Sequence, residues 1–126
     1  AEPPMGSGQV VLVVEDNPHV RKLSIARIRD LGYQVLEAAT GDEAHAMLAS
    51  GTRVDVLFSD IVMPGALNGY DLAALVRKEF PDVKILLTSG YASDVITNRM
   101  GGTGTYRILH KPYRHSDLAE RLQELL

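Results

Sequence analysis

The sequence predicts an α/β domain built on an open sheet of parallel strands with helices on both faces. Short, nearly continuous apolar stretches alternate with longer segments of helical character along the chain, as expected for strands that are covered on both sides. The connections are short, and alternating strands and helices of this length form parallel strands joined by right-handed crossovers. A chain of 126 residues also fits one domain with one sheet.

The first strand is predicted over residues 9–14, an almost uninterrupted β-branched and apolar stretch. Asn17 and Pro18 have the character of an N-cap and a first helical residue, and Gly32 ends the helix that they begin. The apolar positions of this helix are Val20, Leu23, Ile28 and Leu31.

The strand and helix unit then repeats. Further strands are predicted over residues 35–38, 54–58, 84–87 and 107–109. Helices are predicted from a cap at Asp42 to Gly51, from the loop after Gly69 to Pro81, weakly around residues 93–100, and from Ser116 or Asp117 onward. Five strands therefore alternate with five helices.

Composition narrows the class of protein. The net charge is -3 and no basic helix stands out, so direct binding of nucleic acid is not expected. No apolar run approaches the roughly 20 residues that cross a membrane. The absence of cysteine and of a signal peptide predicts a cytoplasmic protein. Residues 1–8, rich in Pro, Gly and Ser, are expected to be a linker or leader, and residues 9–126 the domain.

Polar residues follow four of the five predicted strands, whose carboxyl ends lie at one edge of such a sheet. They are Glu15 and Asp16 after the first strand, Asp60 after the third, Ser89 after the fourth and Lys111 after the fifth. Carboxylates about 4 Å apart repel each other by about 4 kcal/mol per pair, so they need a cation or a raised pKa. Oxygen ligands of this kind suit Mg²⁺.

These residues and the motifs around them resemble the receiver domains of bacterial response regulators and hybrid histidine kinases. The matching segments, within residues 10–126, are VVLVVEDNP, the SDIVMPG run around Asp60, LLTSGYA and HKPY. The resemblance implies a flavodoxin-like (βα)5 fold with strand order 2-1-3-4-5. It also implies a phosphoacceptor of a two-component or phosphorelay system, which catalyses only its own phosphorylation and dephosphorylation.

The resemblance assigns the acidic residues to phosphorylation and to magnesium. Asp60 would be the phosphoacceptor and Asp16 a direct Mg²⁺ ligand, and Glu15 would hold a metal-bound water. Asp60 and the backbone carbonyl of Val62 would complete the protein ligands.

The resemblance also assigns the polar residues at the fourth and fifth strand ends. Lys111 would pair with the phosphoryl group, and Ser89, in preference to the adjacent Thr88, would hydrogen-bond it once attached. The implied donor is a histidine kinase or a histidine phosphotransfer protein. The sequence leaves open a homodimer through the fourth and fifth helices, and whether the domain stands alone or ends a kinase.

The chain departs from the family at the switch residue. Many receivers carry an aromatic residue three places before the lysine, where this chain has Ile108. Tyr106 falls on the same strand face by the period of two. Two alternatives stay open: Tyr106 takes the switch role through a shifted register, or the aromatic switch is absent.

Two other classes of protein compete with this interpretation. A Mg²⁺-dependent phosphatase with an aspartyl-phosphate intermediate would usually carry a second carboxylate two residues after the nucleophile, where this chain has Val62. A receiver-like interaction module without phosphorylation is the other alternative, and the complete acid set with Ser89 and Lys111 argues against it.

Overall fold

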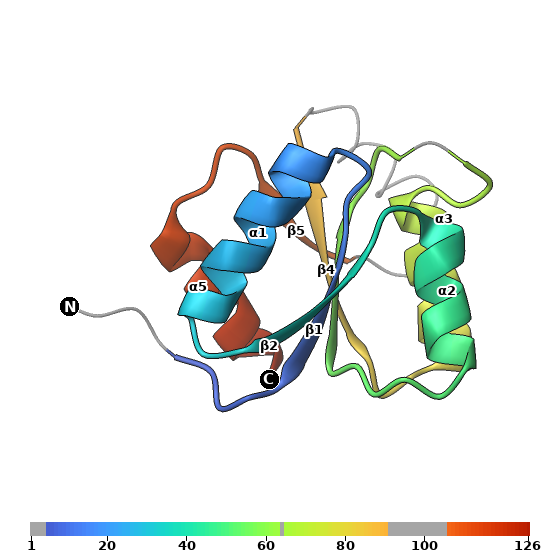
Figure 1. The fold of residues 1–126 in the computed structure, drawn as a ribbon, viewed down its shortest axis with the longest axis horizontal. Coiled ribbons are helices and arrows are strands. Elements are labelled where there is room, and N and C mark those ends of the chain that lie inside the picture. Colours follow the sequence, from blue (N-terminus) through green and yellow to red (C-terminus); the bar gives the residue numbers. More distant parts are fainter. Residues whose placement is uncertain (1–4, 64, 91–105) are drawn as a thin grey trace.

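The computed structural model describes residues 5–63, 65–90 and 106–126, and these form a five-stranded parallel sheet with helices on both faces (Figure 1). The elements are β1 (Val10–Val14), α1 (Pro18–Asp30), β2 (Gln34–Ala38), α2 (Gly41–Ala49), β3 (Val56–Asp60), α3 (Gly69–Glu79), β4 (Lys84–Ser89), β5 (Arg107–His110) and α5 (His115–Leu125). The order β2-β1-β3-β4-β5 confirms the predicted doubly wound sheet. The helix predicted around residues 93–100 lies outside the described residues.

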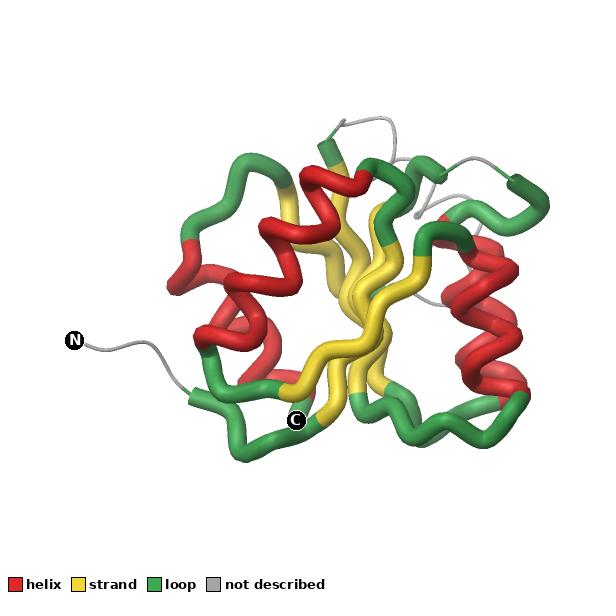
Figure 2. Tube along the Cα trace, in the orientation of Figure 1, coloured by secondary structure: helices red, strands yellow, loops and turns green. Residues whose placement is uncertain are grey.

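Two hydrophobic cores cover the two faces of the sheet. The helices α1 and α5 lie on one face, and α2 and α3 lie on the other (Figure 2). Because successive side chains of a strand point to opposite faces, each strand contributes to both cores. In β1, Val11 and Val13 belong to the core under α1 and α5, and Leu12 and Val14 to the core under α2 and α3. No helix among the described residues has the length and hydropathy needed to cross a membrane.

The start of α1 agrees with the sequence prediction. The side-chain oxygen of Asn17 accepts hydrogen bonds from the backbone N–H groups of His19, at 2.9 Å, and Val20, at 3.1 Å. Pro18 is the first helical residue. An N-cap of this kind satisfies backbone donors that have no partner inside the helix.

The predicted apolar positions of α1 agree with its buried face only in part, since Ile28 and Leu31 are buried. Val20 is 36% exposed and Leu23 is 52% exposed, whereas Ser24, Ile25 and Ile28 are buried. The helix therefore presents two apolar side chains to solvent and one hydroxyl group to the interior.

The helix α2 begins one residue before the predicted cap, so the prediction of Asp42 as the N-cap is wrong. Thr40 is the N-cap, and its hydroxyl oxygen accepts a hydrogen bond from the N–H of Glu43 at 3.1 Å. Asp42 lies in the first turn instead, where a negative charge is stabilised by the helix dipole.

The helix α5 also begins earlier than predicted. Its first residue is His115 and its N-cap position is Arg114. Asp117, one of the two predicted starts, lies in the first turn, where its carboxylate accepts a hydrogen bond from the Arg114 N–H at 3.0 Å. The carboxylate thus satisfies a backbone donor at the helix start, although it does so from the third helical position.

The segment before β1 packs against the turn between α1 and β2. The N–H of Gly6 donates to the carbonyl of Leu31 at 2.6 Å, and the N–H of Gly8 donates to the carbonyl of Gly32 at 3.0 Å. A Cβ at Gly6 would collide with the ring of Tyr33, which is buried. Part of the stretch expected to be a linker or leader is therefore in contact with the domain.

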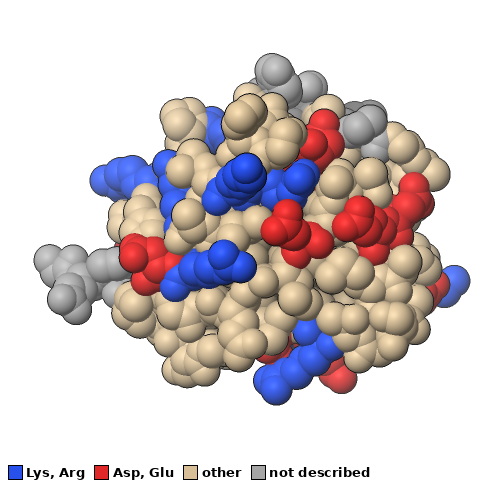
Figure 3. Space-filling view, viewed as in Figure 1, with Lys and Arg blue, Asp and Glu red and all other residues tan. Residues whose placement is uncertain are grey.

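Charged side chains are spread unevenly over the face seen in Figure 3. Lys and Arg side chains gather over α1, and carboxylates gather on the side of α2. The basic residues of α1 are Arg21, Lys22, Arg27 and Arg29, against one acid, Asp30. The expectation that no helix is basic is therefore wrong for α1, despite the net negative charge of the chain.

Candidate functional site

The polar residues that follow the strands meet at the carboxyl edge of the sheet. Both β3 and β4 run two residues further than predicted, because Asp60 still pairs with Thr88 in the ladder, and Ser89 still pairs with His110. Asp60 and Ser89 are therefore held by the sheet itself and not by a loop.

The structure brings three carboxylates together at this edge. One oxygen from each of Glu15, Asp16 and Asp60 lies within 4.8 Å of the others. Glu15 is 6% exposed, Asp60 is partly buried and Asp16 is exposed. The group is thus open to solvent on one side and closed by protein on the other.

Glu15 is fixed by hydrogen bonds to its backbone and to its side chain. Its N–H donates to the carbonyl of Ala38 at 3.1 Å, and its carbonyl accepts from the Arg21 guanidinium at 2.8 Å. Its carboxylate accepts from the Asn17 N–H at 3.1 Å. The N-cap residue of α1 therefore also orients a carboxylate of the site.

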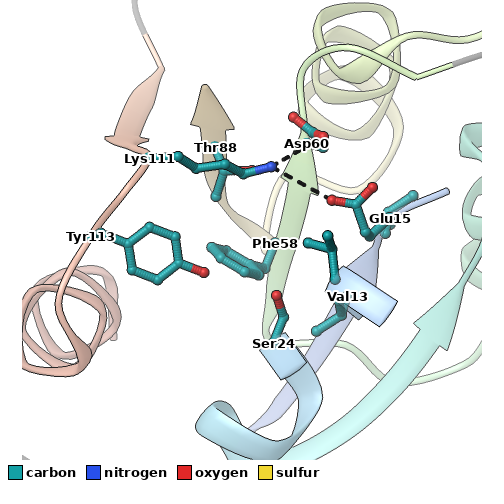
Figure 4. A pocket seen from close by; sticks show the side chains of 10 residues that line it. Val13, Glu15, Ser24, Phe58, Asp60, Thr88, Lys111 and Tyr113 are labelled. Carbon is teal, nitrogen blue, oxygen red and sulfur yellow. Dashed lines mark hydrogen bonds and ion pairs between the residues drawn. The ribbon is translucent and has the colours of Figure 1, made fainter. Parts of the chain in front are cut away.

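Lys111 joins the acidic group from the end of β5. Its Nζ lies 3.3 Å from an Asp60 carboxylate oxygen and 3.6 Å from a Glu15 carboxylate oxygen (Figure 4). Its backbone N–H donates to the carbonyl of Ser89 at 2.8 Å, which ties the residue to β4. One ammonium group thus balances part of the charge of three carboxylates.

The pKa values of both Glu15 and Lys111 are raised at this crowded edge. Burial raises the pKa of Glu15 from 4.5 to about 7, assisted by a hydrogen bond with Asp16 and by repulsion from Asp60. For Lys111, burial lowers the pKa, but the carboxylates of Asp60 and Glu15 outweigh this effect, so the pKa lies above its usual value. The ammonium group is therefore charged at neutral pH.

The start of α3 packs directly on the backbone of Asp60. The N–H of Gly69 donates to the carbonyl of Ile61 at 2.8 Å, and a Cβ at Gly69 would collide with the backbone carbonyl of Asp60. The side chain of Val62, in the loop that connects β3 to α3, is 55% exposed. Only a residue without a side chain lets α3 approach the strand end this closely.

The two hydroxyl residues at the end of β4 are both buried and point to opposite faces. Thr88 lines a cavity with Asp60 and Lys111 on the side of α1 and α5. By the alternation of the strand, Ser89 lies on the face that carries Leu87. The assignment of Ser89 to the phosphoryl group stays a prediction.

Tyr106 and Ile108 both pack against the core under α2 and α3, which confirms that they share a strand face. The Cζ of Arg77 lies 4.0 Å from the centroid of the Tyr106 ring, and the Tyr70 and Tyr106 ring centroids are 6.4 Å apart. Both partners belong to α3. Tyr106 is therefore engaged by α3, and the choice of switch residue stays a prediction.

A small cavity lies beneath Lys111 and was not predicted from the sequence. Its volume is about 10 Å³, and its lining includes Ser24 of α1, Phe58 of β3, Thr88 and Tyr113 (Figure 4). Tyr113 belongs to the HKPY run, so its position close to Lys111 could have been predicted from the sequence. Ser24 carries no such signal, because the apolar residues of α1 suggest a different buried face.

A doubly wound parallel sheet with an acidic group and a lysine at its carboxyl edge defines an α/β domain of the kind that handles phosphoryl groups. Comparison with known families then identifies it. The family model described as response regulator receiver domain matches residues 11–123. The chain belongs to this family and is a receiver domain of two-component signalling.

The chain spans nearly all of some curated relatives and only a part of others. The chain is 35% identical over 123 residues to the sensor kinase CckA of Brucella abortus, covering 97% of this chain and 13% of the kinase. It is 35% identical to a chemotaxis protein CheY homolog of Campylobacter jejuni, covering 92% of this chain and 91% of that protein. It spans 45% of the probable transcriptional regulator ycf27 of Cyanidium caldarium.

Solved structures agree with the family. The response regulator TrrA of Thermotoga maritima, in complex with Mg(2+)-BeF, has a TM-score of 0.79 and 30% identity, covering 94% of this chain and 99% of that chain. The receiver domain of the hybrid histidine kinase CckA has a TM-score of 0.74 and 32% identity, covering 93% of this chain and 98% of that chain.

Proposed function

We propose that this domain takes a phosphoryl group onto Asp60 from a phosphohistidine donor, with Mg²⁺, and that the modified site regulates a partner. The observation that carries the proposal is the contact of Lys111 Nζ with the Asp60 carboxylate, at 3.3 Å, inside a group of three carboxylates. A cation placed beside the nucleophile is what a charged phosphoryl group requires.

The reaction is a displacement at phosphorus. A carboxylate oxygen of Asp60 forms the new P–O bond while the donor's P–N bond breaks, and the histidine leaves with its electron pair and is protonated. The transition state is loose and charge-rich, so the protein acts by positioning and by neutralising the phosphoryl oxygens. Lys111 supplies a fixed positive charge for those oxygens, and Ser89 donates a hydrogen bond to them in the product.

Three observations support Mg²⁺ as the metal. The ligand atoms are carboxylate oxygens, they lie within 4.8 Å of one another, and Glu15 has a pKa raised to about 7 by burial and crowding. A divalent cation with oxygen ligands relieves such crowding. Asp16 and Asp60 would bind it directly, with the Val62 carbonyl, and Glu15 would hold a water of its shell. The ion supplies charge neutralisation for the phosphoryl oxygens.

The regulated state follows from new acceptor oxygens at Asp60. These oxygens attract the hydroxyl of Ser89, whose carbonyl already accepts a hydrogen bond from the Lys111 N–H. A change at Asp60 therefore affects the position of both β4 and β5. The contacts of Tyr106 with α3 favour the alternative in which the aromatic switch is absent and Ile108 occupies its place.

The donor would be a histidine kinase or a histidine phosphotransfer protein that docks on α1, in the cytoplasm. The outward face of α1 supports this, since Val20 and Leu23 are exposed and basic residues surround them. Val20 also lines the cavity that contains Asp60. A partner that covers this face would therefore lie next to the phosphoacceptor. The proposed partner is a protein, and no direct contact of this domain with nucleic acid is proposed.

Intact mass measurement after incubation with acetyl phosphate and Mg²⁺ tests the proposal. We expect one added phosphoryl group in the wild type and in Asp82→Asn, a control at an exposed acid outside the site. Asp60→Asn, or a chelator, should abolish the adduct. An adduct that persists in Asp60→Asn would place the phosphoryl group elsewhere, and an unmodified wild type would favour an interaction module without phosphorylation.

A further inference from the structure

The cavity beneath Lys111 has the size and the lining of a site for one water molecule. Its volume of about 10 Å³ is close to the roughly 10–15 Å³ that a water requires. The wall includes the apolar side chain of Phe58 together with the hydroxyl residues Ser24, Thr88 and Tyr113 (Figure 4). A buried water typically makes two to four hydrogen bonds, and this lining offers that number of partners.

Lys111 has one more donor than its carboxylate partners use. An ammonium group carries three N–H donors. Its Nζ lies 3.3 Å from Asp60 and 3.6 Å from Glu15, which accounts for two directions. Because Lys111 also lines the cavity, its third N–H has a water-sized polar space beside it. A water there would give the ammonium group a hydrogen-bond partner in addition to the two carboxylates.

Ser24 is a buried hydroxyl in the middle of α1. Its side chain belongs to the buried face with Ile25 and Ile28. Ser24 shares the cavity wall with Thr88 and Tyr113. Buried polar groups are usually hydrogen-bonded, and a water in the cavity would offer these hydroxyl groups a common partner.

Tyr113 holds the loop that carries Lys111 against α1. Its ring packs on the core under α1 and α5, and the Cζ of Arg27, on α1, lies 5.7 Å from the ring centroid. Its hydroxyl points into the cavity, toward Phe58 and Ser24 (Figure 4). Tyr113 therefore reaches the cavity from the β5 side, and Ser24 reaches it from α1.

We propose that Tyr113 and Ser24 are positioning residues for Lys111, acting through one water molecule bound in this cavity. The inference rests on the proposed function, because a precisely placed lysine matters only if Asp60 accepts a phosphoryl group. Neither hydroxyl touches the reacting atoms. Their effect is to hold the ammonium group where it meets the phosphoryl oxygens, so their loss slows transfer without removing any group that binds the metal.

The kinetic test uses single-hydroxyl deletions in the whole chain. Tyr113→Phe and Ser24→Ala should each slow phosphorylation by acetyl phosphate at saturating Mg²⁺ by about two- to tenfold, the worth of one hydrogen bond. The Mg²⁺ concentration for half-maximal rate should not change. The double variant should be no slower than the slower single variant within about twofold, because both act through the same water.

Tyr33→Phe is the matched control. Tyr33 is a buried tyrosine of the same core whose hydroxyl has no partner among the described residues, so its phosphorylation rate should equal that of the wild type. Single variants at the wild-type rate, or effects that multiply in the double variant, would overturn the positioning role. A parallel shift of the Mg²⁺ midpoint would also overturn it.

A crystal structure of the wild type at high resolution tests the water by itself. We expect one ordered water within hydrogen-bond distance of Lys111 Nζ and of at least one of the two hydroxyls, and its loss in Ser24→Val, which fills the space. A cavity without density in the wild type overturns the site. If the wild type takes up no phosphoryl group, the proposed function fails together with the positioning role, while the density still decides the water site.

Discussion

Replacing Glu15 by Gln should change how stability depends on pH, in the direction opposite to that of an ordinary ion-paired carboxylate. Glu15 is 6% exposed, and its pKa is raised from 4.5 to about 7, chiefly by burial, then by its hydrogen bond with Asp16 and by repulsion from Asp60. Lys111 lowers this pKa, but not enough to restore the usual value.

The sign follows from proton linkage. Between pH 4.5 and 7 the folded protein keeps a proton on Glu15 that the unfolded chain has lost. This residue therefore contributes stability that is fully present below pH 4.5 and is lost as the pH rises through about 7. A shift from 4.5 to about 7, at 1.36 kcal/mol per pKa unit, corresponds to about 3 kcal/mol of unfolding free energy. A glutamine does not titrate and should not show this loss.

The measurement is urea unfolding followed by far-ultraviolet circular dichroism, in chelator, from about pH 4 to 8, a range set by the two pKa values. Subtracting the wild-type curve from the Glu15→Gln curve removes the groups that both proteins share. We expect the difference to grow by about 3 kcal/mol toward pH 8, with the variant more stable there. Glu120→Gln, at an exposed acid in the middle of α5, serves as the control and should run parallel to the wild type.

Two outcomes would refute the reasoning. Parallel curves for the wild type and Glu15→Gln would mean that Glu15 titrates alike in the folded and unfolded states. A variant that is less stable at pH 8 would mean that the ion pair with Lys111, at 3.6 Å, outweighs burial. Added Mg²⁺ should shrink the difference at pH 8, since a bound cation stabilises the ionised carboxylate.

Three further predictions concern the scaffold. Asn17→Ala should lower the free energy of unfolding in urea by about 1 kcal/mol, because the cap of α1 is lost, whereas Asn17→Asp should retain most of it. Gly69→Ala should lower both stability and the rate of phosphorylation by acetyl phosphate, because its Cβ would meet the Asp60 carbonyl and would lie 2.6 Å from the Cα of Ile61; unchanged values of both would contradict this. Tyr33→Phe should leave the urea midpoint unchanged or raise it, since the deleted hydroxyl has no partner among the described residues.

The strands and their convergence were predictable because parallel strands buried on both faces leave a simple pattern. Apolar residues run without a break and polar residues follow where the strand leaves the core, as at Asp60 and Lys111. The ends were predicted too early for β3 and β4, because hydrogen bonding in the ladder continues through the polar residues Asp60 and Ser89. A polarity change marks the end of burial by apolar residues, not the end of pairing.

The orientation of α1 was predictable only in part from its apolar residues, because Ile28 and Leu31 are buried as predicted and Val20 and Leu23 are not. Leu23 is 52% exposed although it is the more hydrophobic neighbour of the buried Ser24. Hydrophobic periodicity assumes that apolar side chains face the core, and this assumption fails at these two positions of α1, although Ile25 and Ile28 do face the core. Ser24 and the partly exposed Val20 line the cavity beside Asp60 and Lys111, and a functional site is where local preference and fold are expected to disagree.

The same helix therefore connects two parts of the proposed mechanism. Its outer face, with Val20 and Leu23, is available to a donor protein, and its inner face places Ser24 on the wall beneath Lys111. Asp60 lies at a strand end that the sheet fixes, whereas Lys111 follows β5, and the segment after it contacts α1 through Tyr113 and Arg27. A donor that shifts α1 on docking would thus move the support of the lysine and leave the nucleophile in place.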